Sequence, residues 1–244
     1  MTRTTTWTPA SATGVWSLLG AATAEAVSHG RPGWIGLDAQ HGFHDDQSVR
    51  DTLHAVTGVD VLVRVRSLDA GEIGRALDAG ARGVVVPMVE SAQDAARAAA
   101  AVRYPPAGSR SWGPFAPYWG RPEVGAEEAD RQVVCGVMVE TRLGLDHVGE
   151  IAATPGVDMV FVGPYDLALS LGTALDDLLA GDGGELRSIV SACRANDVIP
   201  GVYAGSPARA RQLAEMGFEV LAARSDRDLL IDGVASLGRN VSRT

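Results

Sequence analysis

The amino-acid sequence predicts an α/β protein, a single-domain (β/α)8 barrel that spans residues 1–244. Short runs of Val, Ile and Leu alternate from end to end with Ala-rich stretches of helical periodicity. The apolar runs are nearly continuous, which is typical of parallel strands buried on both faces. Eight runs and eight helical stretches within 244 residues suit a barrel of ordinary size. A doubly wound open sheet is the alternative.

The elements of this barrel can be placed in order along the chain. The expected strands are apolar runs at residues 14–18, 34–37, 61–64, 83–86, 133–139, 159–162, 199–202 and 220–223. The expected helices lie at residues 22–28, 46–55, 70–79, 91–102, 144–153, 185–195, 207–216 and 226–237. Asp69, Ser91 and Ser206 are suitable N-cap residues, and Gly80 and Gly217 are suitable C-terminal stops.

An inserted loop at about residues 104–131 interrupts the alternation. It is rich in Pro and Gly, and four aromatic side chains (Trp112, Phe115, Tyr118 and Trp119) fall within eight positions. Long irregular loops in compact domains are usually functional or disordered, and the aromatic cluster favours a functional loop. It is either a lid that faces the substrate or a contact between subunits.

Composition excludes several classes of protein. The net charge of -9 argues against a nucleic-acid partner, which requires a basic face. No apolar run is long enough for a membrane span, and residues 1–10 lack the apolar core of a secretory signal. The two cysteines are far apart, which favours a reduced, cytoplasmic protein. All 21 basic residues are arginines, so a lysine Schiff base is excluded.

Two carboxylates carry the first indication of chemistry. Glu140 and Asp166 each stand where an apolar run stops, and they are 26 residues apart. This is about the length of one strand–helix–strand unit, so both should emerge at the same end of the sheet. Two hard oxygen ligands with further positions left open suit a divalent cation that also holds a substrate.

Two cationic or titratable side chains are expected at the same end. His41 follows the second strand, and Arg64 ends the third. Each residue has a structural alternative: His41 as a hydrogen-bonded core residue, Arg64 as a partner of an Asp or Glu at the barrel rim, Glu140 as a partner of Arg142 or of a neighbouring helix, and Asp166 as a helix cap. Four strand ends that supply complementary chemistry at one place favour an active site, because active sites of such barrels lie at the C-terminal ends of the strands.

Five segments resemble one known family. Residues 34–42, WIGLDAQHG, resemble the histidine-bearing motif of the HpcH/HpaI family of class II, metal-dependent pyruvate aldolases. Four further segments follow in the family's order, at residues 78–89, 103–110, 139–142 and 161–167. The resemblance runs from about residue 15 to residue 223.

The resemblance implies an aldolase that makes or cleaves a carbon–carbon bond between pyruvate, or hydroxypyruvate, and an aldehyde through an enolate. Glu140 and Asp166 fall on the family's ligands for a divalent cation such as Mg²⁺, Mn²⁺ or Co²⁺. Arg64 falls on the arginine that contacts the keto oxygen. His41 falls on the catalytic histidine, and Asp78 on the acidic residue that pairs with it.

The resemblance also implies how the substrate and the subunits are held. The backbone at Gly163, Pro164 and Tyr165 falls where the family binds the pyruvate carboxylate. The family is typically a homohexamer, a trimer of dimers, in which the C-terminal helix is exchanged between subunits. The implied partners are thus a 2-oxo acid, an aldehyde and further copies of the chain.

The chain departs from the family's pattern at three positions. Gln40 stands where Glu is frequent, Met138 where Gln is frequent, and Tyr165 where a small residue is frequent. We expect Gln40 and Met138 to alter contacts to the substrate, and Arg110 and Trp112 to select the aldehyde. The alternatives are an oxaloacetate-type decarboxylase, a carbon–carbon bond-forming enzyme of specialised metabolism, and a non-catalytic barrel that acts as a binding protein.

Overall fold

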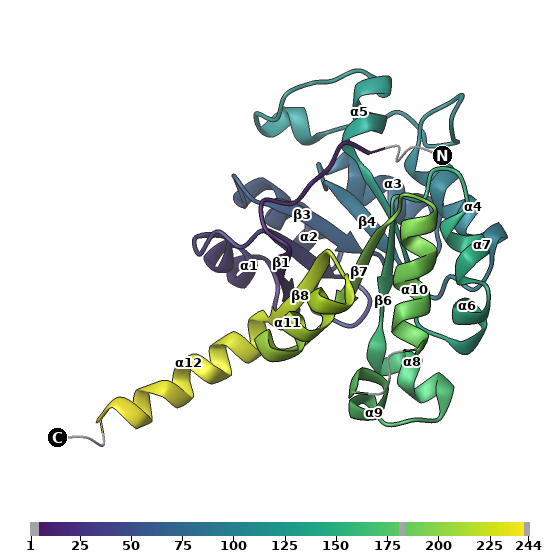
Figure 1. Cartoon of the computed structure of the whole chain (residues 1–244). Coiled ribbons are helices and arrows are strands. Elements are labelled where there is room, and N and C mark those ends of the chain that lie inside the picture. Colours follow the sequence, from purple (N-terminus) through teal and green to yellow (C-terminus); the bar gives the residue numbers. More distant parts are fainter. Residues whose placement is uncertain (1–4, 181–183, 242–244) are drawn as a thin grey trace.

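Eight parallel strands close into a barrel in the computed structural model, which describes residues 5–180 and 184–241 (Figure 1). Each strand pairs with the next in the chain, and β8 pairs with β1. The predicted barrel is therefore confirmed, and the open sheet is excluded. The strands are β1 (Thr13–Ser17), β2 (Trp34–Asp38), β3 (Asp60–Arg64), β4 (Gly83–Val86), β5 (Val134–Val139), β6 (Met159–Val162), β7 (Ile199–Tyr203) and β8 (Val220–Ser225).

The apolar residues of each strand divide between two cores. One set points outward against the surrounding helices and includes Ile35, Leu37 and Val137. The other set fills the barrel interior, where the rings of Trp16 and Phe161 stack at 5.4 Å between centroids. This double burial explains why the strand sequences are apolar at nearly every position.

The helices surround the barrel, and most agree with their predicted positions. They are α1 (Ala21–Ser28), α2 (Asp46–Ala55), α3 (Ala70–Asp78), α4 (Ala92–Val102), α5 (Ala126–Gln132), α6 (Arg142–Asp146), α7 (Val148–Ala152), α8 (Pro164–Leu171), α9 (Leu175–Ala180), α10 (Gly184–Ala195), α11 (Pro207–Met216) and α12 (Asp226–Val241). The predicted N-caps are confirmed, because the side chains of Asp69, Ser91 and Ser206 each accept a hydrogen bond from a backbone N–H of the first turn.

Two regions differ from the predicted elements. The helix expected at 144–153 is split into α6 and α7 at His147, whose ring nitrogen lies 2.9 Å from the carbonyl oxygen of Glu90. The short helices α8 and α9 follow β6 where none was placed. Pro164 begins α8 and the left-handed Gly172 ends it, so local chemistry sets both limits.

The aromatic segment at 104–131 lies over the N-terminal end of the barrel. It contains a 3-10 turn (Ala116–Trp119) and α5, and Arg121 donates hydrogen bonds to the carbonyl oxygens of Leu53 and Val56 at the end of α2. Because the strands run away from this end, the segment does not cover the mouth formed by their C-terminal ends in the same protomer. A lid over that mouth is therefore not formed within one protomer, and a subunit contact remains the expectation for this segment.

The last helix, α12, extends away from the barrel (Figure 1). Its large apolar side chains are exposed, and they are Leu229, Leu230, Ile231, Val234 and Leu237. No helix in residues 5–180 and 184–241 is long and apolar enough to cross a membrane.

Candidate active site

The C-terminal ends of several strands surround a cavity of about 150 Å³. It is lined by Trp16, Leu18, Asp38, His41, Arg64, Met138, Gly163, Pro164, Tyr165, Asp166 and Tyr203. Seven of these were expected at the site from sequence: His41, Arg64, Met138, Gly163, Pro164, Tyr165 and Asp166. Glu140, at the end of β5, is almost wholly buried beside them. The barrel thus brings the two carboxylates, the arginine and the histidine to one end.

Asp38, the last residue of β2, is the centre of the site's hydrogen bonding. Arg64 donates to it from Nε to Oδ1 at 2.9 Å and from a terminal nitrogen to Oδ2 at 2.5 Å. Trp16 Nε1 and the backbone N–H groups of Gln40 and His41 donate to the same carboxylate. Burial alone raises the pKa of Asp38, but the hydrogen bonds and charge of Arg64 bring that pKa below its ordinary value.

Sequence reasoning assigned no role to Asp38. Its signal was present, since it is a charged residue at the end of an apolar strand beside the expected histidine. Trp16 and Tyr203 were missed in the same way; they end or nearly end β1 and β7 and border the cavity. With Leu18, which also lines the cavity, these residues are the additions that the tertiary structure makes to the predicted site.

Arg64 is fixed from three sides. Asp38 holds two of its nitrogens, and its guanidinium carbon lies 5.4 Å from the centroid of the Trp16 ring. The remaining terminal nitrogen lies 3.9 Å from the sulfur of Met138. A thioether is a weak acceptor, so this nitrogen keeps most of its capacity to bind an oxygen in the cavity. Met138 therefore leaves the arginine available to a ligand.

Glu140 lies in an environment that disfavours the charged form of its carboxyl group. Its Oε1 accepts a hydrogen bond from the backbone N–H of Met88 at 2.8 Å. Burial raises its pKa, with a further rise from Asp166, and the Met88 N–H, Arg64 and His41 only partly oppose this. A buried carboxylate beside a second one is the electrostatic condition that a bound cation relieves.

The carboxylates fit a divalent cation. A Cβ atom at Gly163 would lie 2.7 Å from Glu140 Oε2, so the glycine keeps open the space in front of that oxygen. Asp166 is exposed in the first turn of α8, beside Gly163. No group of three or more His, Cys, Asp or Glu side chains suits a metal within the described residues. Two hard ligands with water and substrate in the other positions are typical of Mg²⁺ sites.

His41 and Gln40 lie on the loop between β2 and α2. The imidazole of His41 is exposed at the cavity, and its backbone is fixed by Asp38. The side-chain oxygen of Gln40 is buried without a hydrogen-bond partner in the described structure. His41 thus has the accessibility that proton transfer to a ligand requires, whereas Gln40 does not line the cavity.

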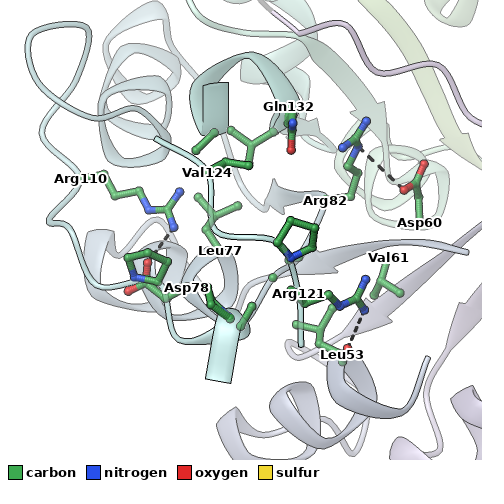
Figure 2. A pocket seen from close by; sticks show the side chains of 18 of the residues that line it. Leu53, Asp60, Val61, Leu77, Asp78, Arg82, Arg110, Arg121, Val124 and Gln132 are labelled. Atoms are coloured by element: carbon green, nitrogen blue, oxygen red, sulfur yellow. Dashed lines mark hydrogen bonds and ion pairs between the residues drawn. The ribbon is translucent and has the colours of Figure 1, made fainter. Parts of the chain in front are cut away.

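Asp78, Arg110 and Trp112 lie at the opposite end of the barrel. Figure 2 shows Asp78 and Arg110 paired in this region. They border a separate cavity of about 290 Å³, together with Asp60 and Arg82 at the starts of β3 and β4. Arg110 donates to Asp78 at 2.7 Å and stacks on the ring of Tyr104 at 4.5 Å.

The expected pairing of Asp78 with His41 is therefore not formed within one protomer. Helix α3 runs antiparallel to the strands, so its last residue, Asp78, lies at the end of the barrel away from His41. For the same reason Arg110 and Trp112 do not border the cavity that holds Arg64 and Asp166.

Several known proteins are similar to this chain in sequence and in fold. A hydroxypyruvate/pyruvate aldolase of Paraburkholderia phytofirmans is 37% identical over 224 residues, which cover 87% of this chain and 86% of that protein. A 2-dehydro-3,6-dideoxy-6-sulfogluconate aldolase of Pseudomonas putida is 31% identical, with 89% and 88% covered. The crystal structure of an HpcH/HpaI aldolase/citrate lyase family protein from Burkholderia cenocepacia has a TM-score of 0.87 and 34% identity, and the match covers 95% of both chains. The family model for HpcH/HpaI aldolase/citrate lyase matches residues 13–233, so this chain belongs to that family.

Proposed function

We propose that the protein is a metal-dependent carbon–carbon lyase, a class II pyruvate aldolase. It joins or separates an aldehyde and a pyruvate or hydroxypyruvate unit. The observation that carries the proposal is the convergence of Arg64, held by Asp38, with the carboxylates Glu140 and Asp166 at one cavity. The names of the two related aldolases support the reaction class.

Arg64 is proposed to bind the keto oxygen of the 2-oxo acid. Removal of a proton from C3, or cleavage of the C3–C4 bond, places negative charge on that oxygen as an enolate. A guanidinium already fixed by Asp38 needs no reorganisation as this charge develops, which is the condition for effective electrostatic stabilisation. Met138 contributes by leaving one nitrogen of Arg64 without a strong internal acceptor.

The start of α8 is proposed to hold the carboxylate of the same substrate. Gly163 is the N-cap, Pro164 follows it, and Tyr165 lies in the first turn. The first turn of a helix presents backbone N–H groups and a positive dipole end, both of which favour an anion. The two ends of a 2-oxo acid are thereby placed between Arg64 and α8.

Glu140 and Asp166 are proposed to hold a divalent cation, with Mg²⁺, Mn²⁺ and Co²⁺ as the candidates. Such a cation supplies Lewis-acid stabilisation of the enolate charge when it is bound. His41 then has the proton-transfer role: its exposed imidazole at the cavity is suited to take the proton of the aldol hydroxyl during cleavage and to return it during addition.

The aldehyde is proposed to meet an aromatic border. Tyr165 and Tyr203 line the cavity with their ring centroids 6.1 Å apart, and Tyr203 also contacts Trp16. Within one protomer these rings, rather than Arg110 and Trp112, are positioned to limit the size of the acceptor.

We further propose a homo-oligomer, with the hexamer of the resemblance as the expected form. Five large apolar side chains on one projecting helix, α12, are an unfavourable surface for an isolated protomer. A cytoplasmic location is supported by Cys135 and Cys193, which are both buried free thiols, as is usual in a reducing compartment.

The proposal is tested by hydrogen exchange at C3 of pyruvate in D₂O, followed by NMR with Mg²⁺, Mn²⁺ or Co²⁺ supplied. We expect exchange by the wild type, loss of exchange in Glu140→Ala and Asp166→Ala, and no change in Glu150→Ala, which removes an exposed carboxylate on α7. Absence of exchange with all three metals, or equal rates in Glu140→Ala and the wild type, would contradict the proposed chemistry.

A further inference from the structure

A buried polar network lies behind the mouth and has no part in the mechanism above. It consists of Ser17 at the end of β1, His44 in the loop after β2, and Asp226 at the start of α12. Each of these three residues is at most 2% exposed to solvent. Ser17 Oγ donates to Asp226 Oδ2 at 2.8 Å and lies 3.0 Å from His44 Nε2. The other ring nitrogen of His44 lies 3.1 Å from Ser48 Oγ.

The direction of these hydrogen bonds can be deduced from the number of protons. The single hydroxyl proton of Ser17 is given to the carboxylate of Asp226, so Ser17 must accept the proton on Nε2 of His44. Nδ1 of the neutral imidazole then accepts a hydrogen bond, which the hydroxyl of Ser48 donates. Burial lowers the pKa of His44, against the opposing charges of Asp226, Asp38 and Asp45, which agrees with a neutral ring.

The network is attached to the loop that carries His41. The backbone N–H of Phe43 donates to the carbonyl oxygen of Leu18 at 2.7 Å, so this loop rests on the end of β1. Asp226 accepts hydrogen bonds from the N–H groups of Leu18 and Leu19, which fixes the same stretch from the other side. His44 is the side chain that joins the loop to this anchored stretch.

We propose that His44 is a positioning residue that holds the His41 loop at the distance and orientation needed for proton transfer. The imidazole of His41 lies at the cavity with no hydrogen bond of its own in the described structure, so its place depends on the backbone that carries it. Asp38 fixes that backbone at Gln40 and His41, and His44 fixes it three residues later. The inference rests on the proposed function for its catalytic consequence, whereas its geometric consequence is independent of it.

Two substitutions at one position separate positioning from simple packing. In His44→Gln the amide nitrogen can replace Nε2 as the donor to Ser17, whereas the shorter His44→Asn can replace only Nδ1. With pyruvate and glycolaldehyde as probe substrates, we expect His44→Ala and His44→Asn to lower kcat by about 10- to 100-fold, because small misplacements have effects of that size. His44→Gln should recover most of kcat. The KM for pyruvate should change less than about threefold in all variants, because Arg64 and α8 are untouched.

A stability control and a second measurement complete the test. Thr154→Ala removes a part-buried hydrogen bond to the Glu150 carbonyl far from the mouth, and we expect it to lower the melting temperature without lowering kcat. Hydrogen–deuterium exchange with mass spectrometry should show faster exchange in the peptide covering residues 39–47 in His44→Ala and His44→Asn, but not in His44→Gln. Unchanged exchange in His44→Ala would overturn the inference, and so would a kcat within twofold of the wild type. A wild type without turnover contradicts the proposed function, and the exchange data alone then decide the role of His44.

Discussion

The pair formed by Asp38 and Arg64 should be the strongest single interaction at the mouth, and a double-mutant cycle can measure it. Both side chains are buried, at 1% and 7% exposure, and two hydrogen bonds join them. Removal of one partner from a buried ion pair leaves an uncompensated charge, which costs about 3–5 kcal/mol. Asp38→Ala also leaves Trp16 Nε1 without its acceptor, so its cost should lie in the upper part of that range.

The expected change in melting temperature follows from the length of the chain. At about 2.1 cal/mol/K per residue, unfolding of a 244-residue domain has an entropy of about 0.5 kcal/mol/K. A loss of 3–5 kcal/mol then corresponds to a fall of about 6–10 °C, measured by calorimetry on metal-free protein. Arg64→Met alone should have a similar effect, because it leaves the carboxylate of Asp38 unpaired.

The double variant, Asp38→Ala with Arg64→Met, decides whether the two residues act together. Its loss in free energy of unfolding should be smaller than the sum of the two single losses by at least about 2 kcal/mol, because no unpaired charge remains. Strictly additive effects, or a cost below about 1 kcal/mol for Asp38→Ala, would refute the view that Asp38 holds Arg64 in place. Asp38→Ala should also lower kcat strongly, since it frees Arg64 to move.

Three further predictions concern the proposed metal ligand Glu140, the glycine beside it and the pH dependence of stability. Glu140→Gln should abolish the binding of Mn²⁺ in calorimetric titration. The melting temperature of the metal-free protein should stay unchanged or rise, because the substitution removes a carboxylate whose pKa is already raised by burial. A large loss of stability would contradict this prediction. Gly163→Ala should weaken Mn²⁺ binding by at least about tenfold, because its Cβ would displace Glu140 Oε2, whereas Gly149→Ala, with nothing within 4 Å, should have no effect. Because the pKa of His44 is lowered in the folded protein, the unfolded chain binds a proton more readily at this residue, and the free energy of unfolding should fall as the pH decreases below about 6.5, the ordinary histidine value. His44→Gln should reduce this dependence of the unfolding free energy on pH, as measured by urea titrations at several pH values. The same pH dependence in both proteins would show that His44 is not the group responsible.

Much of the fold could be predicted because its signals are local. A strand buried on both faces must be apolar at nearly every position, and runs such as Val134–Val139 have no other simple explanation. The helix limits at Asp69 and Ser91 follow from side chains that satisfy the first N–H groups. Short helices such as α9 were not predicted, because six residues are too few for a periodic pattern to stand out.

Part of the candidate active site could also be predicted from local signals in the sequence. In a parallel barrel all strands end on the same side, so a polar residue that stops an apolar run must face the mouth. That rule alone was enough to group His41, Arg64, Glu140 and Asp166, which the structure brings to one end. Asp38 obeys the same rule, and its role was missed because its side-chain partners, Arg64 and Trp16, lie on other strands.

The sequence by itself therefore determined the barrel and the end of the barrel at which the active-site residues lie. Burial and strand direction produce a regular alternation of apolar runs and polar strand ends, and this pattern is visible in the sequence. Only the tertiary structure decided the pairings. It joined Asp38 to Arg64 across neighbouring strands, and it tied Ser17 to Asp226 across 209 residues. It also carried Asp78 to the far end of the barrel, because α3 runs back against the strands. Such contacts depend on how distant segments meet in space, and no local pattern of residues encodes that.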